Sequence, residues 1–161
     1  MIKINLITVG KLKENYWRQA AAEYSKRLSP FCELNIVELN EHRLSDNPSQ
    51  KEIEIALRDE AKSMEKYTLA KSAYNIAMCI EGRMISSEDL AKKISDCGIN
   101  GFSSINFIIG SSFGIDQQIK QSADFKLSIS KMTFPHQLAR IILLEQIYRG
   151  FQINANTRYH K

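Results

Sequence analysis

The stretch INFIIGSSFG, residues 105–114, decides the fold class. Its first half is an almost unbroken apolar run of the length expected for a strand that is buried on both faces, as parallel strands are. Apolar or alternating segments at residues 2–9, 34–39, 74–80 and 125–129 predict further strands, with helical patterns between them. Strands that alternate with helices predict an α/β domain with a mainly parallel sheet.

Local signals predict where several elements end. Glu81-Gly82 predicts a turn after the third strand, and Gly98 predicts the end of the helix that follows Ser86. A short helix is expected after the glycine loop. A tight loop over residues 130–135 then leads into a long final helix that begins near His136.

Length and composition predict a single domain over residues 1–161. With 43% hydrophobic residues, the chain can bury a core without disulfides or a structural metal. Cys32, Cys79 and Cys97 form no CxxC pair, which favours a reducing, cytoplasmic compartment and argues against a metal site. The N-terminal residues alternate like a strand, unlike a signal peptide, and no stretch reaches membrane-spanning length. A net charge of +4 permits RNA binding without requiring it.

The final helix is apolar around its whole circumference, so it must be covered on every side. Within it, Glu145 and Arg149 lie one turn apart and form either an ion pair or part of a catalytic site. The same helix of a second copy is one possible cover, which predicts a homodimer. A monomer whose first helix covers the outer face is the alternative. The apolar positions are Leu138, Ala139, Ile141, Ile142, Leu143, Leu144, Ile147 and Tyr148.

Three strand ends offer places for chemistry, since ligands of open parallel sheets bind beyond the carboxyl ends of the strands. They are residues 78–82, 110–114 and 130–136. The loop GSSFG is neither a G-x-G-x-x-G dinucleotide motif nor a P-loop, so taken alone it is a flexible turn. The tail, residues 154–161, taken alone is a frayed terminus.

Taken together, FIIGSSFG (107–114), SISKMTFPHQLARIILLEQIYRGFQI (128–153) and RYHK (158–161) resemble one family, the SPOUT-type class H methyltransferases of large-subunit ribosomal RNA. The opening INLITVGKLKENYWRQAAAEYSKRL (4–28) extends the resemblance to essentially the whole chain. The resemblance implies helices on both faces of the sheet, a C-terminal trefoil knot (the α/β-knot fold), and S-adenosylmethionine (SAM) bound by the knot loops. Knots are otherwise nearly absent from proteins.

The resemblance also implies which residues contact the cofactor. Apolar side chains there would sandwich adenine, and glycine would permit close backbone approach. Three departures could reshape the pocket: Ser111 replaces a usual glycine, Phe113 replaces Asn or Glu, and Cys79 replaces an acid. The implied contacts are Met78, Gly110, Ile129, Ser130, Lys131, Met132, Thr133 and Phe134.

The substrate implied by the resemblance is a pseudouridine of 23S ribosomal RNA in the assembled ribosome, methylated at N3. That nitrogen becomes nucleophilic as its imide proton leaves. His136 and His160 are both candidate bases, Arg140 could stabilise the imide anion, and Tyr159 could stack on the base. The tail is expected to complete the partner subunit's site. A knotted SAM-binding, ribosome-associated factor without turnover is the alternative function, and a nucleotide-dependent oxidoreductase is poorly supported.

RNA binding is expected to depend on basic residues of the dimer surface, because the subunit has no appended RNA-binding domain. The candidates are Lys11, Lys13, Arg18, Lys26, Arg27, Lys131 and Arg158.

Overall fold

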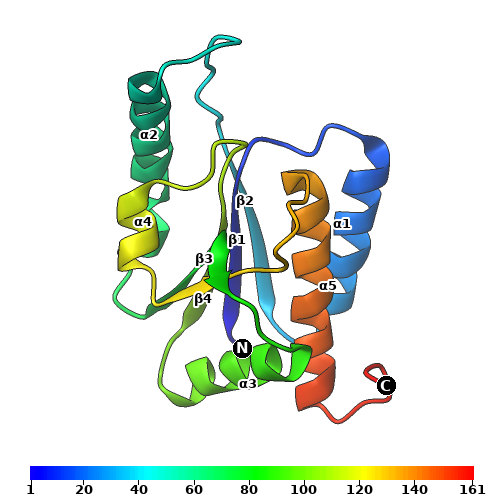
Figure 1. Cartoon of the computed structure of the whole chain (residues 1–161). Coiled ribbons are helices and arrows are strands. Elements are labelled where there is room, and N and C mark those ends of the chain that lie inside the picture. The colour runs from blue at the N-terminus through cyan, green and yellow to red at the C-terminus, as the bar shows by residue number, and fades with distance from the viewer.

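The structure, a computed structural model, describes residues 1–161, in which strands and helices alternate along the chain (Figure 1). The strands are β1 (Lys3–Val9), β2 (Glu33–Leu39), β3 (Ala73–Arg83), β4 (Ser104–Ile109) and β5 (Phe125–Leu127). The helices are α1 (Asn15–Leu28), α2 (Gln50–Thr68), α3 (Ser87–Ile99), α4 (Gln117–Ser122) and α5 (His136–Asn154). The predicted alternation of strands and helices is confirmed.

The five strands form one sheet in the order β2-β1-β4-β3-β5, and all neighbouring pairs are parallel. Helices α1, α3 and α5 cover one face of the sheet, while α2 and α4 cover the other (Figure 1). Helices α1 and α3 carry the chain toward the β2 edge, and α2 and α4 carry it toward the β5 edge. All four crossovers therefore share one handedness, as expected for βαβ units.

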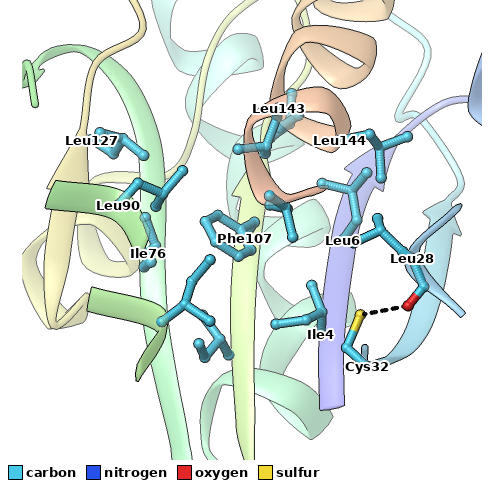
Figure 2. Close-up of a cluster of buried hydrophobic side chains, with 14 of the residues drawn as sticks. Ile4, Leu6, Leu28, Cys32, Ile76, Leu90, Phe107, Leu127, Leu143 and Leu144 are labelled. Carbon is cyan, nitrogen blue, oxygen red and sulfur yellow. Dashed lines mark hydrogen bonds between the residues drawn. The ribbon is translucent and has the colours of Figure 1, made fainter. Parts of the chain in front are cut away.

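The larger core fills the space between the sheet and the layer of α1, α3 and α5 (Figure 2). Phe107 on the central strand β4 is fully buried there, and Leu144 of α5 is fully buried in the same cluster. Truncating such a side chain to alanine costs about 2–5 kcal/mol. Cys32 also lies in this core, and burial raises the pKa of its thiol to about 11. The middle of α5, two turns from the site described below, is fixed by the buried contact of Leu144.

A row of asparagines crosses four strands of the sheet at one level. Asn5 pairs in register with Asn35 on one side and Asn106 on the other, and Asn106 pairs with Asn75. Their side-chain amides hydrogen-bond in sequence, at 3.2 Å from Asn35 to Asn5, 2.7 Å from Asn5 to Asn106 and 2.8 Å from Asn106 to Asn75. Asn5 and Asn106 are buried, and a shift of β1 or β4 by one residue would leave their amides unpaired, so the row favours a single register.

The turn predicted at Glu81-Gly82 is wrong, because β3 continues through both residues to Arg83. The strand bulges away from β5, since Met78 and Arg83 both pair with Leu127 and the residues between them have no partner on β5. A bulge bends a strand and redirects its side chains. The segment between Met78 and Arg83 is therefore displaced from the plane of the sheet beyond the carboxyl end of β5.

Two other boundaries differ slightly from the prediction. Strand β5 ends at Leu127 instead of Ile129, and Ser128 leaves the sheet while donating from its backbone N–H to the carbonyl of Arg83 at 3.0 Å. Helix α3 extends through Gly98 to Ile99. The left-handed residue that follows this helix is Gly101, with φ of +83°.

Helix α5 is at least partly covered within the single chain, since none of its residues from 136 to 153 is fully exposed, although Ile141 and Ile142 are only half-buried. On one flank Tyr148 meets Tyr24 of α1, with ring centroids 6.4 Å apart. On the other, Gly150 packs so closely against α3 that an added Cβ would lie 3.1 Å from Ile94. Helix α1 therefore covers part of α5, as in the alternative that the sequence left open. The apolar side chains around α5 do not by themselves require a second copy of the chain. No helix has the length and apolar character needed to cross a bilayer.

Candidate active site

A cavity of about 720 Å³ opens at the carboxyl ends of β3, β4 and β5. Strands β3 and β4 are neighbours in the sheet, as are β3 and β5, so the segments that follow them meet at one edge. This is the position at which open parallel sheets bind ligands. The lining residues are Met78, Cys79, Ile80, Glu81, Ile109, Gly110, Ser111, Ser112, Phe113, Gly114, Ile115, Lys120, Leu127, Ser128, Ile129, Ser130, Met132, Thr133, Phe134, Pro135, His136 and Ala139.

The glycine loop after β4 is held in one shape by close backbone packing. A Cβ on Gly110 would lie 2.1 Å from the carbonyl oxygen of Gly114, so no other residue fits there. Gly114 itself has φ of +92°, a conformation that favours glycine. The buried Ile115 anchors the end of the loop in the smaller core. The loop is therefore a rigid cradle, in contrast to the flexible turn that its sequence alone permits.

The opposite wall comes from the bulged end of β3. A Cβ on Gly82 would lie 2.7 Å from the backbone of Leu127, so glycine is what lets this segment lie against β5. Glu81 points across to α4, where its carboxylate lies 2.6 Å from the Nζ of Lys120. This hydrogen bond holds the pKa of Glu81 below its usual range. Burial, followed by the nearby charge of Glu81, raises the pKa of the Cys79 thiol, which is therefore neutral at pH 7.

The loop between β5 and α5 supplies the third wall. Its backbone is held by two short-range bonds, from Ser128 Oγ to the Ser130 carbonyl at 2.9 Å and from the Met132 amide to Ser130 Oγ at 3.0 Å. Met132 and Ile129 remain exposed at 71% and 37% of their surface. Apolar side chains that stay exposed at the edge of a cavity are available to a ligand or to a partner protein.

His136 lines the cavity, whereas Arg140 one turn later does not. The guanidinium of Arg140 is 1% exposed and donates to the Glu38 carboxylate at 2.8 Å and to the Gly10 carbonyl at 3.1 Å. Glu38 in turn accepts from the Leu12 amide at 3.3 Å. Arg140 thus ties the start of α5 to the ends of β1 and β2, and its charge is compensated within the fold.

The C-terminal tail folds back beside the end of α5 (Figure 1), and none of its residues lines the cavity. Tyr159 stacks edge-on against Tyr148, with ring centroids 4.9 Å apart, and donates to Glu145 at 3.1 Å. His160 lies 2.8 Å from Glu88 at the start of α3. The tail contacts begin about 14 Å along α5 from His136, at a rise of about 1.5 Å per residue. Neither Tyr159 nor His160 borders the cavity of its own subunit.

The ion pair predicted as one possibility between Glu145 and Arg149 is present at 2.6 Å. Glu145 also accepts from Tyr159, and the Arg149 guanidinium lies 4.8 Å from the Tyr159 ring centre. The pair therefore positions the tail.

A parallel sheet with a largely apolar cavity at its carboxyl edge is typical of open α/β proteins that bind a small molecule at that edge. A family model described as "Predicted SPOUT methyltransferase" matches residues 2–160. The ribosomal RNA large subunit methyltransferase H of Clostridium novyi is 49% identical over 160 residues, which are 99% of this chain and 100% of the relative. The protein of the same name from Bifidobacterium adolescentis is 51% identical over 164 residues, which are 99% of this chain and 100% of the relative. The chain belongs to the SPOUT methyltransferases and, within them, to the ribosomal RNA large subunit methyltransferase H family.

A solved structure described as "a probable methylase family protein from Haemophilus influenzae Rd KW20" is similar over 98% of this chain and 70% of that chain, with a TM-score of 0.57. Its sequence identity of 12% limits that similarity to the fold.

SPOUT methyltransferases use SAM, and the residues of this cavity fit it. The volume lies within the usual range for small-molecule sites, and the Gly110 cradle allows close backbone approach. Seven of the eight residues implied by the resemblance line the cavity, Lys131 being the exception. Sequence reasoning missed the opposing charges of Glu81 and Lys120. The Asp116 cap of α4, whose side chain accepts from the Gln118 amide at 2.9 Å, was the available signal that Lys120 lies in a helix next to the loop.

Proposed function

We propose that this protein transfers the methyl group of SAM to N3 of a pseudouridine in 23S ribosomal RNA of the assembled ribosome. The observation that carries the proposal is the convergence of seven implied cofactor residues, from three separate strand ends, on one cavity. The relatives that match over their whole length are named for methylation of large-subunit ribosomal RNA. The pseudouridine and its N3 position follow from the sequence resemblance.

The cofactor, when bound, supplies a methyl group already activated by a positive sulfur. The chain has to place the base beside that methyl group and assist the loss of one proton. His136 is positioned for this proton because it lines the cavity and because histidine titrates near neutral pH. His160 remains a second candidate in the tail of a partner subunit.

Arg140 is proposed as a positioning residue. Direct stabilisation of an imide anion, the role expected from the sequence, needs an accessible guanidinium, whereas Arg140 is 1% exposed and paired with Glu38. Its bonds to Glu38 and Gly10 orient the first turn of α5, and therefore His136.

The active unit is proposed to be a homodimer in which each tail completes the partner's cavity. Tyr159 and His160 do not line their own cavity. A second hollow of about 230 Å³ adjoins that cavity, since Met78 and Ile129 line both. Ile85, Ile129 and Ile142 line this hollow, and Met84 near it is 50% exposed. Apolar surface of this kind beside the cavity suits an interface between two copies.

A C-terminal trefoil knot, within one domain spanning residues 1–161, is part of the same proposal. The chain after β5 passes directly against the bulged end of β3, with Ser128 bonded to Arg83 and Gly82 packed on Leu127. Helix α5 then covers the face of the sheet opposite α4. Because the substrate is ribosomal, the protein is expected to act in the cytoplasm, with the basic residues named above contacting RNA phosphates.

Deletion of residues 158–161 tests the role of the tail. We expect SAM binding and dimerisation to be nearly unchanged, while methyl transfer to ribosomes collapses. The stricter measurement uses a heterodimer of one tail-deleted subunit and one subunit whose glycine loop is damaged so that it no longer binds SAM. If tails act across the interface, about one site per heterodimer remains active. Complete inactivity, with both parent homodimers folded, would show that tail and cavity must belong to one chain.

The alternative function, a SAM-binding ribosome-associated factor without turnover, is supported only by the altered loop residues Ser111 and Phe113. Phe113 is 46% exposed and both residues line the cavity. The full-length protein separates the two functions: SAM binding without methylation of any ribosomal particle would favour the alternative.

A further inference from the structure

The cavity contains one Lys or Arg side chain, and it is paired with an acid. Lys120 comes from α4, Glu81 comes from the bulged end of β3, and both line the cavity. Their charged atoms lie 2.6 Å apart. The Lys120 side chain is 15% exposed and the Glu81 side chain 52%. The cation is therefore largely enclosed, while the anion lies nearer the opening.

The fold fixes both side chains. Lys120 lies within α4, the short helix that follows the glycine loop. Asp116 caps the start of this helix, and Ile119 buries one of its faces. Glu81 is held by Gly82, whose contact with the backbone of Leu127 leaves no room for a side chain. The pair thus bridges two of the three cavity walls in a defined geometry.

The bonding of Lys120 leaves capacity for a ligand. An ammonium group has three donors, and Glu81 accepts the one side-chain hydrogen bond that Lys120 makes in the structure. Two donors of an enclosed cation are thus available for an acceptor in the cavity. Glu81 has a second carboxylate oxygen and stays ionised at neutral pH, because the Lys120 hydrogen bond holds its pKa low.

SAM has two chemically different ends. The adenosine end is uncharged and suits apolar walls and backbone groups, whereas the amino-acid end carries an α-carboxylate and an α-ammonium. Among the lining side chains, apart from His136, only Lys120 and Glu81 can carry charge at neutral pH once the Cys79 thiol is neutral. One charge-assisted hydrogen bond to the α-carboxylate and one from the α-ammonium would be among the stronger contacts available in the cavity.

We propose that Lys120 and Glu81 form the subsite for the amino-acid end of SAM, with Lys120 binding the α-carboxylate and Glu81 binding the α-ammonium. The proposal rests on the proposed function of the cavity and adds which wall receives the charged end. It orients the cofactor so that its adenosine end lies toward the walls formed by the glycine loop and the loop after β5.

The experiment compares SAM with decarboxylated SAM, which keeps the sulfonium and the amine but lacks the carboxylate. Calorimetry with the full-length protein should show decarboxylated SAM binding about tenfold more weakly or worse, as expected for loss of a charge-assisted hydrogen bond. In Lys120→Met, SAM should weaken to the affinity of decarboxylated SAM, and decarboxylated SAM should be unchanged. Lys62→Met replaces an exposed lysine of α2 and is the matched control. This variant should still bind SAM more tightly than decarboxylated SAM.

Equal binding of the two ligands to the unaltered protein would overturn the subsite without touching the proposed function, and this comparison needs no variant to fold. Equal weakening of both ligands by Lys120→Met would also overturn it, since Lys120 would then shape the cavity in general. Unchanged SAM binding in Lys120→Met together with lost methylation of ribosomes would assign Lys120 to RNA instead. Absence of any SAM binding by the unaltered protein would contradict the proposed function itself.

Discussion

Substitution of Gly110 by alanine should damage the cavity far more than the removal of one glycine suggests. The added Cβ would lie 2.1 Å from the Gly114 carbonyl oxygen, 2.4 Å from the Gly114 carbonyl carbon and 2.8 Å from Cγ1 of Ile115. Close C···O contacts in proteins lie near 3.3 Å, so Gly114 must move by about 1 Å. Ile115 is buried, so the displacement cannot be absorbed by moving it into solvent.

Overpacking of this kind costs about 1–3 kcal/mol. For a chain of this length, each kcal/mol shifts the melting temperature by roughly 2–4 °C, so Tm should fall by about 2–12 °C. Because the displaced loop lines the cavity, SAM affinity should fall by about tenfold or more, equivalent to roughly 1.4 kcal/mol. Thermal unfolding and calorimetric titration with SAM measure the two effects.

Gly98→Ala is the matched control. Gly98 lies in α3, and an added Cβ there would meet nothing within 4 Å. Alanine in a helix is more favourable than glycine by about 0.5–1 kcal/mol, so Tm should rise slightly and SAM binding should not change. A Gly110→Ala protein with the Tm and SAM affinity of the unaltered chain would refute the rigid-cradle interpretation.

Three further outcomes follow from the same structure. Of the three cysteines, only Cys79 should react with iodoacetamide, because Cys32 and Cys97 are buried. The reaction should be slow at pH 7, since the pKa of the Cys79 thiol is raised, and bound SAM should protect the thiol. Mass spectrometry of labelled peptides measures this, and labelling of Cys32 or Cys97 in the folded protein would contradict it. Burial raises the pKa of the Glu60 carboxyl, so the folded state binds a proton more tightly than the unfolded state. The stability of the fold therefore decreases as pH rises from the ordinary pKa of a glutamate to the raised pKa of the folded state. Glu60→Gln should therefore gain stability at pH 7 and little at pH 4 in urea unfolding, and an equal gain at both pH values would argue against this cause. Asn106→Leu should remove one of the two inner members of the asparagine row and leave the amides of Asn5 and Asn75 without that partner. We expect a loss of about 1–3 kcal/mol of stability in chemical denaturation, and an unchanged stability would contradict this.

The order of strands and helices could be predicted from the sequence because each element carries its own local pattern. The 105–109 run and the helical periods depend on burial of one face or two, which periodicity reports directly. The positions of the cavity walls could be predicted for the same reason, since ligand sites follow strand ends in parallel sheets.

Other features depend on contacts between residues distant in sequence, which no local pattern reveals. The β3 bulge that brings Glu81 to Lys120 is fixed by how Gly82 packs on Leu127, so the sequence predicted a turn there instead. Likewise, the expectation that Arg140 stabilises the imide anion took no account of its burial. Its partner Glu38 lies 102 residues away, and the start of α5 packs over that carboxylate.

The proposed reaction is tested most directly by mass spectrometric mapping of 23S ribosomal RNA from cells that have the gene and cells that lack it. We predict that one pseudouridine-containing fragment loses the mass of one methyl group when the gene is deleted. It should regain that mass on complementation with the unaltered chain, and should not regain it with the chain lacking residues 158–161. An identical modification pattern in all of these strains would contradict the assignment of this protein as a methyltransferase of that RNA.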